Sequence, residues 1–204
     1  WITMVVTFVV TAITARIWPL SSKSNAYYNN QPGDPEEYKQ GNLLVTAWEE
    51  ALVSANNSIP IGKNIMDNLK DGFVMAMGIL PSIMSVGLIG LVVAKYTPVF
   101  DVLGYLFYPV TALFNLPEPM LAAKACAVGI AEMFLPALLV AGAPLVTKFV
   151  IGVVSISAIL FFSASIPCIL STEIPLTIPE IVVIWFQRTL LTLIIIIPIA
   201  YWIL

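Results

Sequence analysis

The apolar positions of this chain form long runs that polar and proline-containing stretches interrupt. Residues 1–18 are apolar and rich in β-branched side chains, and residues 72–94 contain no charged side chain. The last run, residues 181–204, contains a single charge, Arg188. Because about 20 apolar residues cross a bilayer as a helix, we expect a transmembrane helix in each run. The first is expected to have its start cut off and to end at Pro19.

The segment between the first two runs has a different pattern. Residues 20–42 are rich in Ser, Asn, Gly and Pro, which indicates an extramembrane loop. Over residues 43–55 and 61–73, apolar side chains recur on one helical face, as in helices that lie in the membrane interface or pack on a bundle. We therefore divide the chain into a truncated first helix (1–19), an extramembrane loop with interfacial amphipathic helices (20–71) and a transmembrane domain (72–204).

Two stretches of the transmembrane domain are too short or too polar for a full span. Residues 102–114 supply about 20 Å of helix, against a hydrocarbon core of about 30 Å, before a turn that contains Asn115 and Glu118. Residues 163–175 form a turn rich in hydroxyls and prolines that contains Glu173. We expect broken or re-entrant elements near 102–119 and 163–179.

These two interruptions resemble each other, because each places a glutamate beside a proline after a shortened apolar run. Paired broken helices in the two halves of a transporter mark its midplane binding site. The match is short, and two unrelated proline turns would partly reproduce it. A true repeat and a coincidence are therefore both open.

Residues 120–142 and 149–162 are two further expected spans, and the first contains Lys124 and Glu132. An ionisable group at membrane depth costs on the order of 3 kcal/mol on insertion scales, so each must face a partner, the bundle interior or water. On one helix the two residues would lie about 12 Å apart along the axis, too far to pair directly. Arg188 is then the expected further cation for Glu132. A buried ion pair that fixes helix register is the alternative to a ligand or ion site at Glu132.

A helix that stops inside a membrane leaves backbone groups that side chains, water or a ligand must satisfy. The hydroxyls of the second interruption suit this role, although they could instead bond only to helix carbonyls. Glu118 and Glu173 could equally lie at the membrane interface, and Arg188 could snorkel. The candidate binding residues are Glu132, Lys124, Ser163, Ser165, Ser171, Thr172, Glu173, Asn115, Glu118 and Arg188.

Composition places the chain among integral membrane proteins. Apolar residues make up 59% of it and charged residues 10%, against about 25% charged in soluble domains, and the mean hydropathy is +0.95. The net charge is −3 and there is no basic patch, so we expect no nucleic-acid partner. The sequence has no histidine, and Cys126 and Cys168 lack metal or redox spacing. We expect no enzymatic activity, no cofactor and no bound metal.

Parts of the chain resemble the YjiH-like bacterial inner-membrane proteins, which carry a nucleoside recognition, or Gate, domain. The resemblance covers about residues 60–204 and is most specific over Gly129-Ile-Ala-Glu132-Met-Phe-Leu-Pro136 and over residues 163–175. In the related nucleoside carriers the motif is Gly-Gln-Thr-Glu-x-Pro, whose polar side chains contact the nucleoside. Here only Gly129 and Glu132 match, and isoleucine and alanine replace the amide and the hydroxyl. The resemblance therefore implies a membrane site at Glu132 more than it implies a nucleoside ligand.

The sequence as a whole predicts an all-α, polytopic membrane helix bundle of about five spanning helices, Gate-like, in a bacterial inner membrane. The first functional hypothesis is a transporter or permease module that binds a small polar solute or ion around Glu132. The alternative is a structural or accessory subunit that assembles with another membrane protein or with its own copies. Lysine and arginine residues place the 19–71 loop on the cytoplasmic side.

Overall fold

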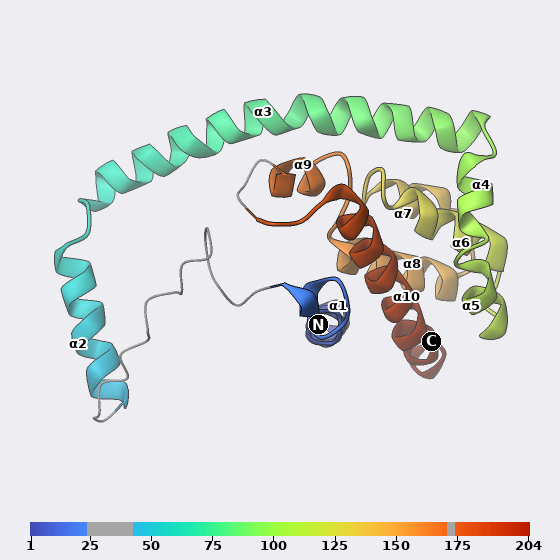
Figure 1. The fold of residues 1–204 in the computed structure, drawn as a ribbon, viewed down its shortest axis with the longest axis horizontal. Coiled ribbons are helices and arrows are strands. Elements are labelled where there is room, and N and C mark those ends of the chain that lie inside the picture. Colours follow the sequence, from blue (N-terminus) through green and yellow to red (C-terminus); the bar gives the residue numbers. More distant parts are fainter. Residues whose placement is uncertain (24–42, 171–173) are drawn as a thin grey trace. The chain divides into compact units, whose positions relative to one another are not determined.

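The computed structural model describes residues 1–23, 43–170 and 174–204, and within these ranges every regular element is helical (Figure 1). The chain separates into two compact units, one formed by residues 1–23 with 81–204 and the other by residues 24–80. The all-helical fold class predicted from the sequence is confirmed for the described residues.

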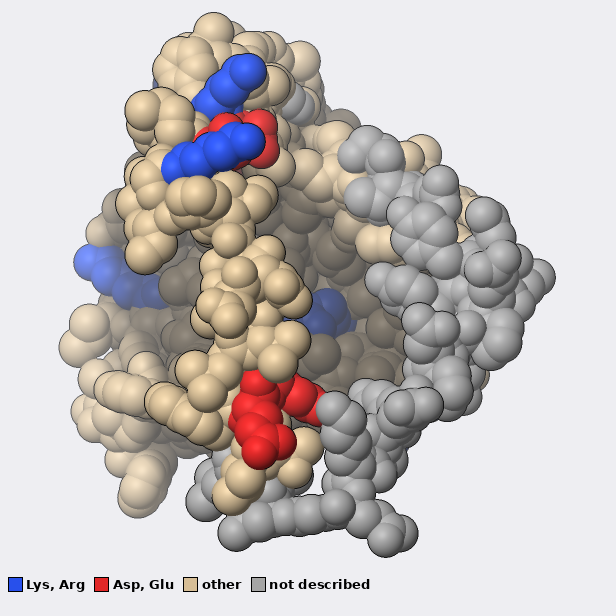
Figure 2. Space-filling model, turned by 90° about the vertical axis from the view of Figure 1, so that its left-hand side faces the viewer, with Lys and Arg blue, Asp and Glu red and all other residues tan. Residues whose placement is uncertain are grey.

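The smaller unit contains helix α2 (Leu43–Asn56) and the first part of helix α3 (Ile61–Tyr96). Both helices were predicted, and the domain boundary expected at residues 71 and 72 falls inside one continuous helix, α3. The 36-residue helix runs through Gly72 and continues through Pro81 into the larger unit. On α2 the predicted apolar stripe is exposed: Trp48 is 68% exposed. Figure 2 shows one face of the molecule, on which charged side chains form small separate groups.

The larger unit is a bundle of short helices around one long one. Its elements are α1 (Ile2–Thr14), the 3-10 turn η1 (Leu20–Ser22), the second part of α3, α4 (Val99–Gly104), α5 (Tyr108–Leu113), α6 (Pro119–Val128), α7 (Leu135–Leu139), α8 (Leu145–Ala158), α9 (Ser165–Leu170) and α10 (Ile178–Ile203). Helix α10 packs against α1, α5 and α8, while α6 packs against α4, α5, α7 and α8.

Small side chains let these helices approach closely. The four alanines of α6 are fully buried, and a Cβ atom added to Gly104 of α4 would lie 3.1 Å from the backbone nitrogen of Lys124. Phe107, between α4 and α5, is also fully buried, and its ring lies 5.6 Å from that of Trp185 and 5.3 Å from that of Phe186 on α10. The core of the larger unit therefore lies where α4 to α6 meet α8 and α10.

Several predicted boundaries are wrong. Helix α1 ends at Thr14 and not at Pro19, because the amides of Arg16 and Ile17 bond three residues back and tighten the chain into a turn. The span expected over 120–142 is interrupted after Val128 and resumes at Leu135 as α7. The short element expected over 102–114 is two six-residue helices, and the span expected over 149–162 is α8, which begins at Leu145 and ends at Ala158.

Two of the described helices, α3 and α10, are long and apolar enough to cross a membrane, by length and composition alone. Half of the most apolar 18-residue window of α10 is buried within the protein, but only 6% of the corresponding window of α3 is. Helices α1, α6 and α8 are apolar but shorter. These observations are compatible with a membrane protein. The five spanning helices expected from the sequence stay a prediction.

Candidate functional site

The non-helical segments that follow α6 and α8, residues 129–134 and 159–164, meet in space. The amide of Phe162 donates a hydrogen bond to the carbonyl of Ile130 at 2.8 Å, and the amide of Ser163 donates one to the carbonyl of Ala131 at 3.1 Å. Backbone groups just beyond a helix end have no helical partner. Here each non-helical segment supplies the hydrogen-bond partners of the other's backbone. This pairing joins the two stretches that the sequence singled out, around Glu132 and around Ser163.

The chain enters this junction from α8 through a left-handed residue. Ile159 has φ 63° and ψ −26°, which places it at the C-terminal cap of α8. Phe161 lies two residues after Ile159. The hydroxyl of Ser165 accepts a hydrogen bond from the amide of Phe161 at 2.8 Å and donates one to the carbonyl of Phe161 at 3.3 Å. Ser165, a candidate binding residue, therefore holds the turn before α9 through bonds to the backbone of Phe161.

Glu132 lies in the other half of the junction and is partly buried. One of its carboxylate oxygens, Oε2, accepts hydrogen bonds from the amide of Phe134 at 2.6 Å and from that of Leu135 at 3.2 Å. A carboxylate at this place satisfies amides that begin α7 and interacts favourably with the positive end of that helix. Glu132 thus has a structural role that the sequence analysis did not foresee.

The carboxylate-bearing side chain also borders a groove of about 660 Å³ in the larger unit. Its other walls are the second part of α3 and the start of α7, and they are mostly apolar. The groove is lined by Ile83, Met84, Ser85, Gly87, Leu88, Leu91, Glu132, Phe134 and Leu135. Glu132 therefore lies in an open, apolar-walled site with two backbone partners and is not sealed in a dry ion pair.

Ser163 is fully buried, and its hydroxyl has no hydrogen-bond partner. A buried polar group without a partner costs roughly 1–3 kcal/mol, so this hydroxyl needs a partner that the described residues do not supply. Its backbone is bonded to Ala131, the residue before Glu132. The junction therefore brings together the segments of one free hydroxyl and one carboxylate.

Lys124 has a partner that the sequence analysis missed. Its ammonium Nζ donates to Oδ2 of Asp101 on α4 at 2.9 Å, and the lysine side chain is 20% exposed. The expectation that Lys124 needs a partner other than Glu132 is confirmed. Asp101 could have been found as the nearest acid at the edge of a neighbouring short element, but the close packing at Gly104 that brings α4 onto α6 has no local signal.

Arg188 was expected to pair with Glu132, and this expectation is wrong. The residue is 6% exposed. Its guanidinium donates to the hydroxyl of Thr11 on α1 at 3.0 Å and to the carbonyl of Ser157 on α8 at 2.9 Å. The hydroxyls of Ser157 and Thr192 are in turn 2.9 Å apart. This polar cluster, in which Ser157, Arg188 and Thr192 are buried and Thr11 is exposed, was missed because its members come from three helices.

Asn115 and Glu118 lie in an exposed turn that hydroxyl groups hold in place. Both have positive φ, 48° and 55°. Three hydroxyls from neighbouring helices donate to carbonyls of this turn: that of Tyr201 to Asn115 at 2.7 Å, that of Thr147 to Pro117 at 2.6 Å and that of Thr111 to Pro119 at 3.0 Å. In the described part of the chain no hydrogen bond or ion pair links this turn to Glu132 or Ser163.

The remaining candidates belong to the stretch that follows α9. Ser171, Thr172 and Glu173 lie outside the described residues. Within the described ranges, no three Cys, Asp or Glu side chains come close enough together to hold a metal ion. Of the residues proposed from the sequence, the structure therefore brings only the segments of Glu132 and Ser163 together.

No family model matches the sequence, and no solved structure matches it. The chain is similar to an uncharacterized protein of Alkalihalophilus pseudofirmus, with 35% identity over 205 residues. The match covers 98% of this chain but 44% of the relative, so the chain spans less than half the length of that protein.

Proposed function

We propose that this chain is a Gate-like module of a multi-pass transporter or permease in a bacterial inner membrane. In this proposal a small polar solute or ion binds at the junction of the segments that follow α6 and α8, between Ser163 and Glu132. The buried hydroxyl of Ser163, which has no partner, is the observation that carries the proposal. The resemblance of the junction sequences to Gate-domain proteins agrees with it.

The lengths of the helices that lead into the junction support a membrane setting. Helix α6 has 10 residues and α8 has 14, which correspond to about 15 and 21 Å against a hydrocarbon core of about 30 Å. Each stops at a non-helical segment whose backbone is paired with the other. Irregular backbone at membrane depth is tolerated where it is buried in protein or lines a cavity, and transporters bind their substrates at such discontinuous helices.

The chemistry of the junction suits a ligand that accepts a hydrogen bond from a hydroxyl or donates one to it. Ser163 can do either, and Glu132 supplies a carboxylate that has one oxygen, Oε2, engaged by backbone amides. Because the groove beside Glu132 is open, a solute could reach this carboxylate from the α3 side of the larger unit.

The test compares Ser163→Ala with Ser155→Ala. Ser155 is also a buried serine, but its hydroxyl bonds only to the carbonyl of Gly152 in its own helix. The full chain in detergent is screened by thermal unfolding with uridine, glycine and sodium ions, and any solute that stabilises it is then tested for uptake into proteoliposomes. We expect Ser163→Ala and Glu132→Gln to abolish binding and uptake, while Ser155→Ala retains both.

Stability separates a binding role from a packing role in this experiment. Removing a hydroxyl that has no partner should leave the free energy of unfolding unchanged or raise it by up to about 1 kcal/mol. A Ser163→Ala protein that is folded and still binds and takes up the solute as the parent does would contradict the proposal, as would a complete lack of response to the screen.

The second candidate is a structural or accessory subunit, and the surface of α3 favours it. In the larger unit, Met84, Leu88 and Ile89 of α3 are 73%, 63% and 62% exposed. Exposed apolar surface on this scale indicates contact with lipid or with another protein. A second membrane protein that co-purifies in stoichiometric amount and is lost on Leu88→Glu would support this candidate, whereas a monodisperse single chain that binds a solute supports the transporter.

A further inference from the structure

Arg188 is a buried cation whose positive charge no acid of the described chain balances. The residue is 6% exposed, and both of its hydrogen bonds go to neutral oxygens, those of Thr11 and Ser157. Its Nε has no partner. The two ion pairs within the described ranges use other cations, Lys23 and Lys124.

The surroundings compensate this charge only in part. Ser157 is the last residue but one of α8, so Arg188 lies at the negative end of that helix, which is worth roughly half an elementary charge. The hydroxyl of Thr11 also donates to the carbonyl of Thr7 and contributes no net charge. A buried charge is stable where it is paired and fully hydrogen-bonded. What is missing at Arg188 is therefore an acceptor that carries negative charge.

The position of Arg188 along α10 distinguishes two sources of such an anion. Arg188 follows Ile178, the first residue of α10, by ten residues, or about 15 Å of helix. The first turn of α10 carries Glu180, which pairs with Lys23 at 2.6 Å and marks the polar end of the helix. If α10 crosses the bilayer, Arg188 lies near the middle of the hydrocarbon core, out of reach of a lipid phosphate at the surface. A solute bound inside the bundle can occupy that depth.

We propose that Arg188 forms an anion site, at which the carboxylate or phosphate group of the transported solute binds between α1, α8 and α10. The inference rests on the proposed transport function and narrows its substrate to solutes that carry a carboxylate or phosphate group. The guanidinium supplies the charge and the free Nε–H, which suits planar oxyanions that accept two hydrogen bonds. The hydroxyl of Thr11 and the carbonyl of Ser157 hold the guanidinium, and the hydroxyl of Ser157 lies 2.9 Å from that of Thr192.

The chain offers a direct readout, because it contains two arginines, Arg16 and Arg188. Uniform ¹⁵N-arginine labelling of the full chain gives two Nε–H resonances, which an Arg16→Lys variant assigns. Arg16 is exposed, and its one hydrogen bond to a described residue goes to the carbonyl of Ala12 in the preceding turn, so it serves as an internal control. The protein is titrated with sodium acetate, sodium phosphate and sodium chloride in a non-ionic detergent that contains no phospholipid.

We expect acetate or phosphate to shift the Arg188 resonance saturably while the Arg16 resonance stays in place. Saturation by acetate alone identifies a carboxylate site, and saturation by phosphate identifies a phosphate site. Thr11→Val removes one guanidinium partner but leaves the charge, and should change the apparent affinity by about tenfold, as the loss of a hydrogen bond to a charged group does. This variant keeps Arg188 itself, so the test does not depend on a protein that folds without this arginine.

Three results would overturn the proposal: no shift, equal shifts of both arginines, or a shift that appears only when phosphatidylglycerol is added. The last would identify a lipid headgroup as the anion. The outcome is separable from that of the Ser163 test. If uptake of a neutral solute depends on Ser163 while Arg188 does not respond, the transporter stands and the anion site fails. If Arg188 responds but no solute is taken up, the site stands without the transport function.

Discussion

At the scale of single residues, the junction depends on one unfavourable backbone conformation. Ile159 is β-branched and has a φ of 63°. For such a side chain the left-handed region is rare and costs roughly 1–2 kcal/mol. The side chain is 46% exposed, so packing gives little in return. The conformation persists because it turns the chain at the end of α8 so that the amides of Phe162 and Ser163 reach their carbonyl partners.

Ile159→Gly should therefore stabilise the protein. Glycine adopts positive φ without a steric cost but loses more backbone entropy on folding, so the expected net gain in the free energy of unfolding is about 0.5–1 kcal/mol. Ile159→Val keeps the β-branch and should be neutral within a few tenths of a kcal/mol. Reversible unfolding in detergent measures both. A destabilised glycine variant would mean that the side chain of Ile159 packs against something essential, which would contradict this explanation.

At the scale of elements, two glycines of α3 determine how closely that helix approaches the segment around Glu132. A Cβ atom at Gly90 would lie 3.0 Å from the Cβ of Ala131 and 3.1 Å from a methyl carbon of Leu135. At Gly87 the nearest atom would be the Cγ of Glu132, at an ordinary 3.7 Å. The two positions are about one helical turn apart, and Gly87 leaves room for an added methyl group whereas Gly90 does not.

This difference predicts opposite effects of the same substitution. Gly90→Ala should lower the free energy of unfolding by about 1–3 kcal/mol, because overpacking forces the helix and the segment apart. Gly87→Ala should be neutral or stabilise by up to about 1 kcal/mol through helix propensity. Unfolding of both variants in the same detergent tests the prediction, and equal effects would show that α3 does not hold the position described here. Gly152, whose added Cβ would meet nothing within 4 Å, provides a further control.

Sequence patterns predicted the elements whose structure depends on local properties. The amphipathic pattern gave α2 and the start of α3, and the Pro and Glu residues near 179 gave the start of α10, where Thr177 and Glu180 form a capping box. The interruption after Val128 was not predicted, because most residues around it are apolar and only Glu132 and Pro136 break the pattern. Hydropathy does not distinguish buried helix from buried non-helical backbone, and the pairing that replaces helix here involves carbonyls and amides 32 residues apart in sequence, such as Ile130 and Phe162.

The candidate site was predictable only in part, for a similar reason. Charge inside an apolar run identified Glu132, Lys124 and Arg188, but their partners are Asp101, Thr11, Ser157 and backbone amides of α7. Each partner depends on which helices pack together. The hydroxyl cluster identified Ser163 correctly as a residue at a helix interruption, and only the coordinates separate it from Ser165, whose hydroxyl is used by its own turn.

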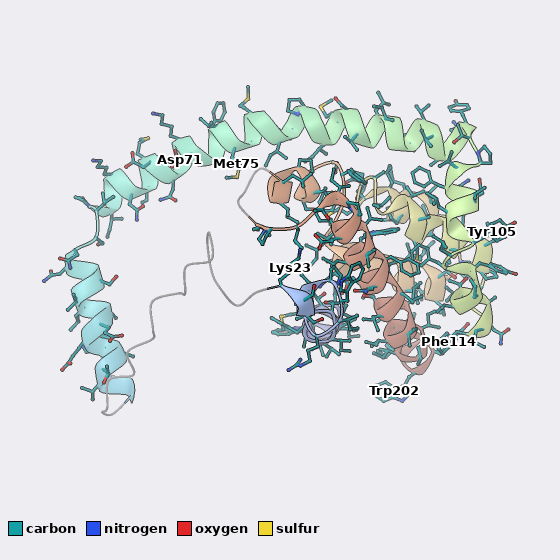
Figure 3. The ribbon with its side chains drawn as sticks, viewed as in Figure 1. Lys23, Asp71, Met75, Tyr105, Phe114 and Trp202 are labelled. Carbon is teal, nitrogen blue, oxygen red and sulfur yellow. The ribbon has the colours of Figure 1, made fainter. Side chains whose placement is uncertain are left out.

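At the scale of the whole molecule, the two ends of α10 have different chemistry. The first turn carries the Lys23–Glu180 pair, and the last turn ends in Tyr201 and Trp202, which are 47% and 87% exposed. Figure 3 shows Trp202 at the end of α10, pointing away from the bundle. Charged and aromatic side chains at opposite ends of an apolar helix are typical of anchors at two membrane interfaces.

This arrangement predicts that Ser21 and Trp202 lie on opposite sides of the membrane. In a background without Cys126 and Cys168, Ser21→Cys and Trp202→Cys should each react with a membrane-impermeant maleimide from one side only, and from different sides. The positive-inside rule places Ser21 on the cytoplasmic side, so it should react in inverted vesicles. Labelling of both positions from the same side would show that α10 does not cross the bilayer.

The shortness of α6 and α8 has a consequence for biosynthesis. A helix of 10 or 14 residues, the first carrying Lys124, is too short to partition into lipid alone as it leaves the translocon. The non-helical backbone after α6 finds its hydrogen-bond partners only when the segment after α8 has been synthesised. In a membrane protein of this design, residues 119–170 would be retained beside the translocon and released as one unit, after α10 has been synthesised and can pack against α8. Nascent chains truncated before residue 178 should therefore cross-link to the insertion machinery, and chains that include α10 should not.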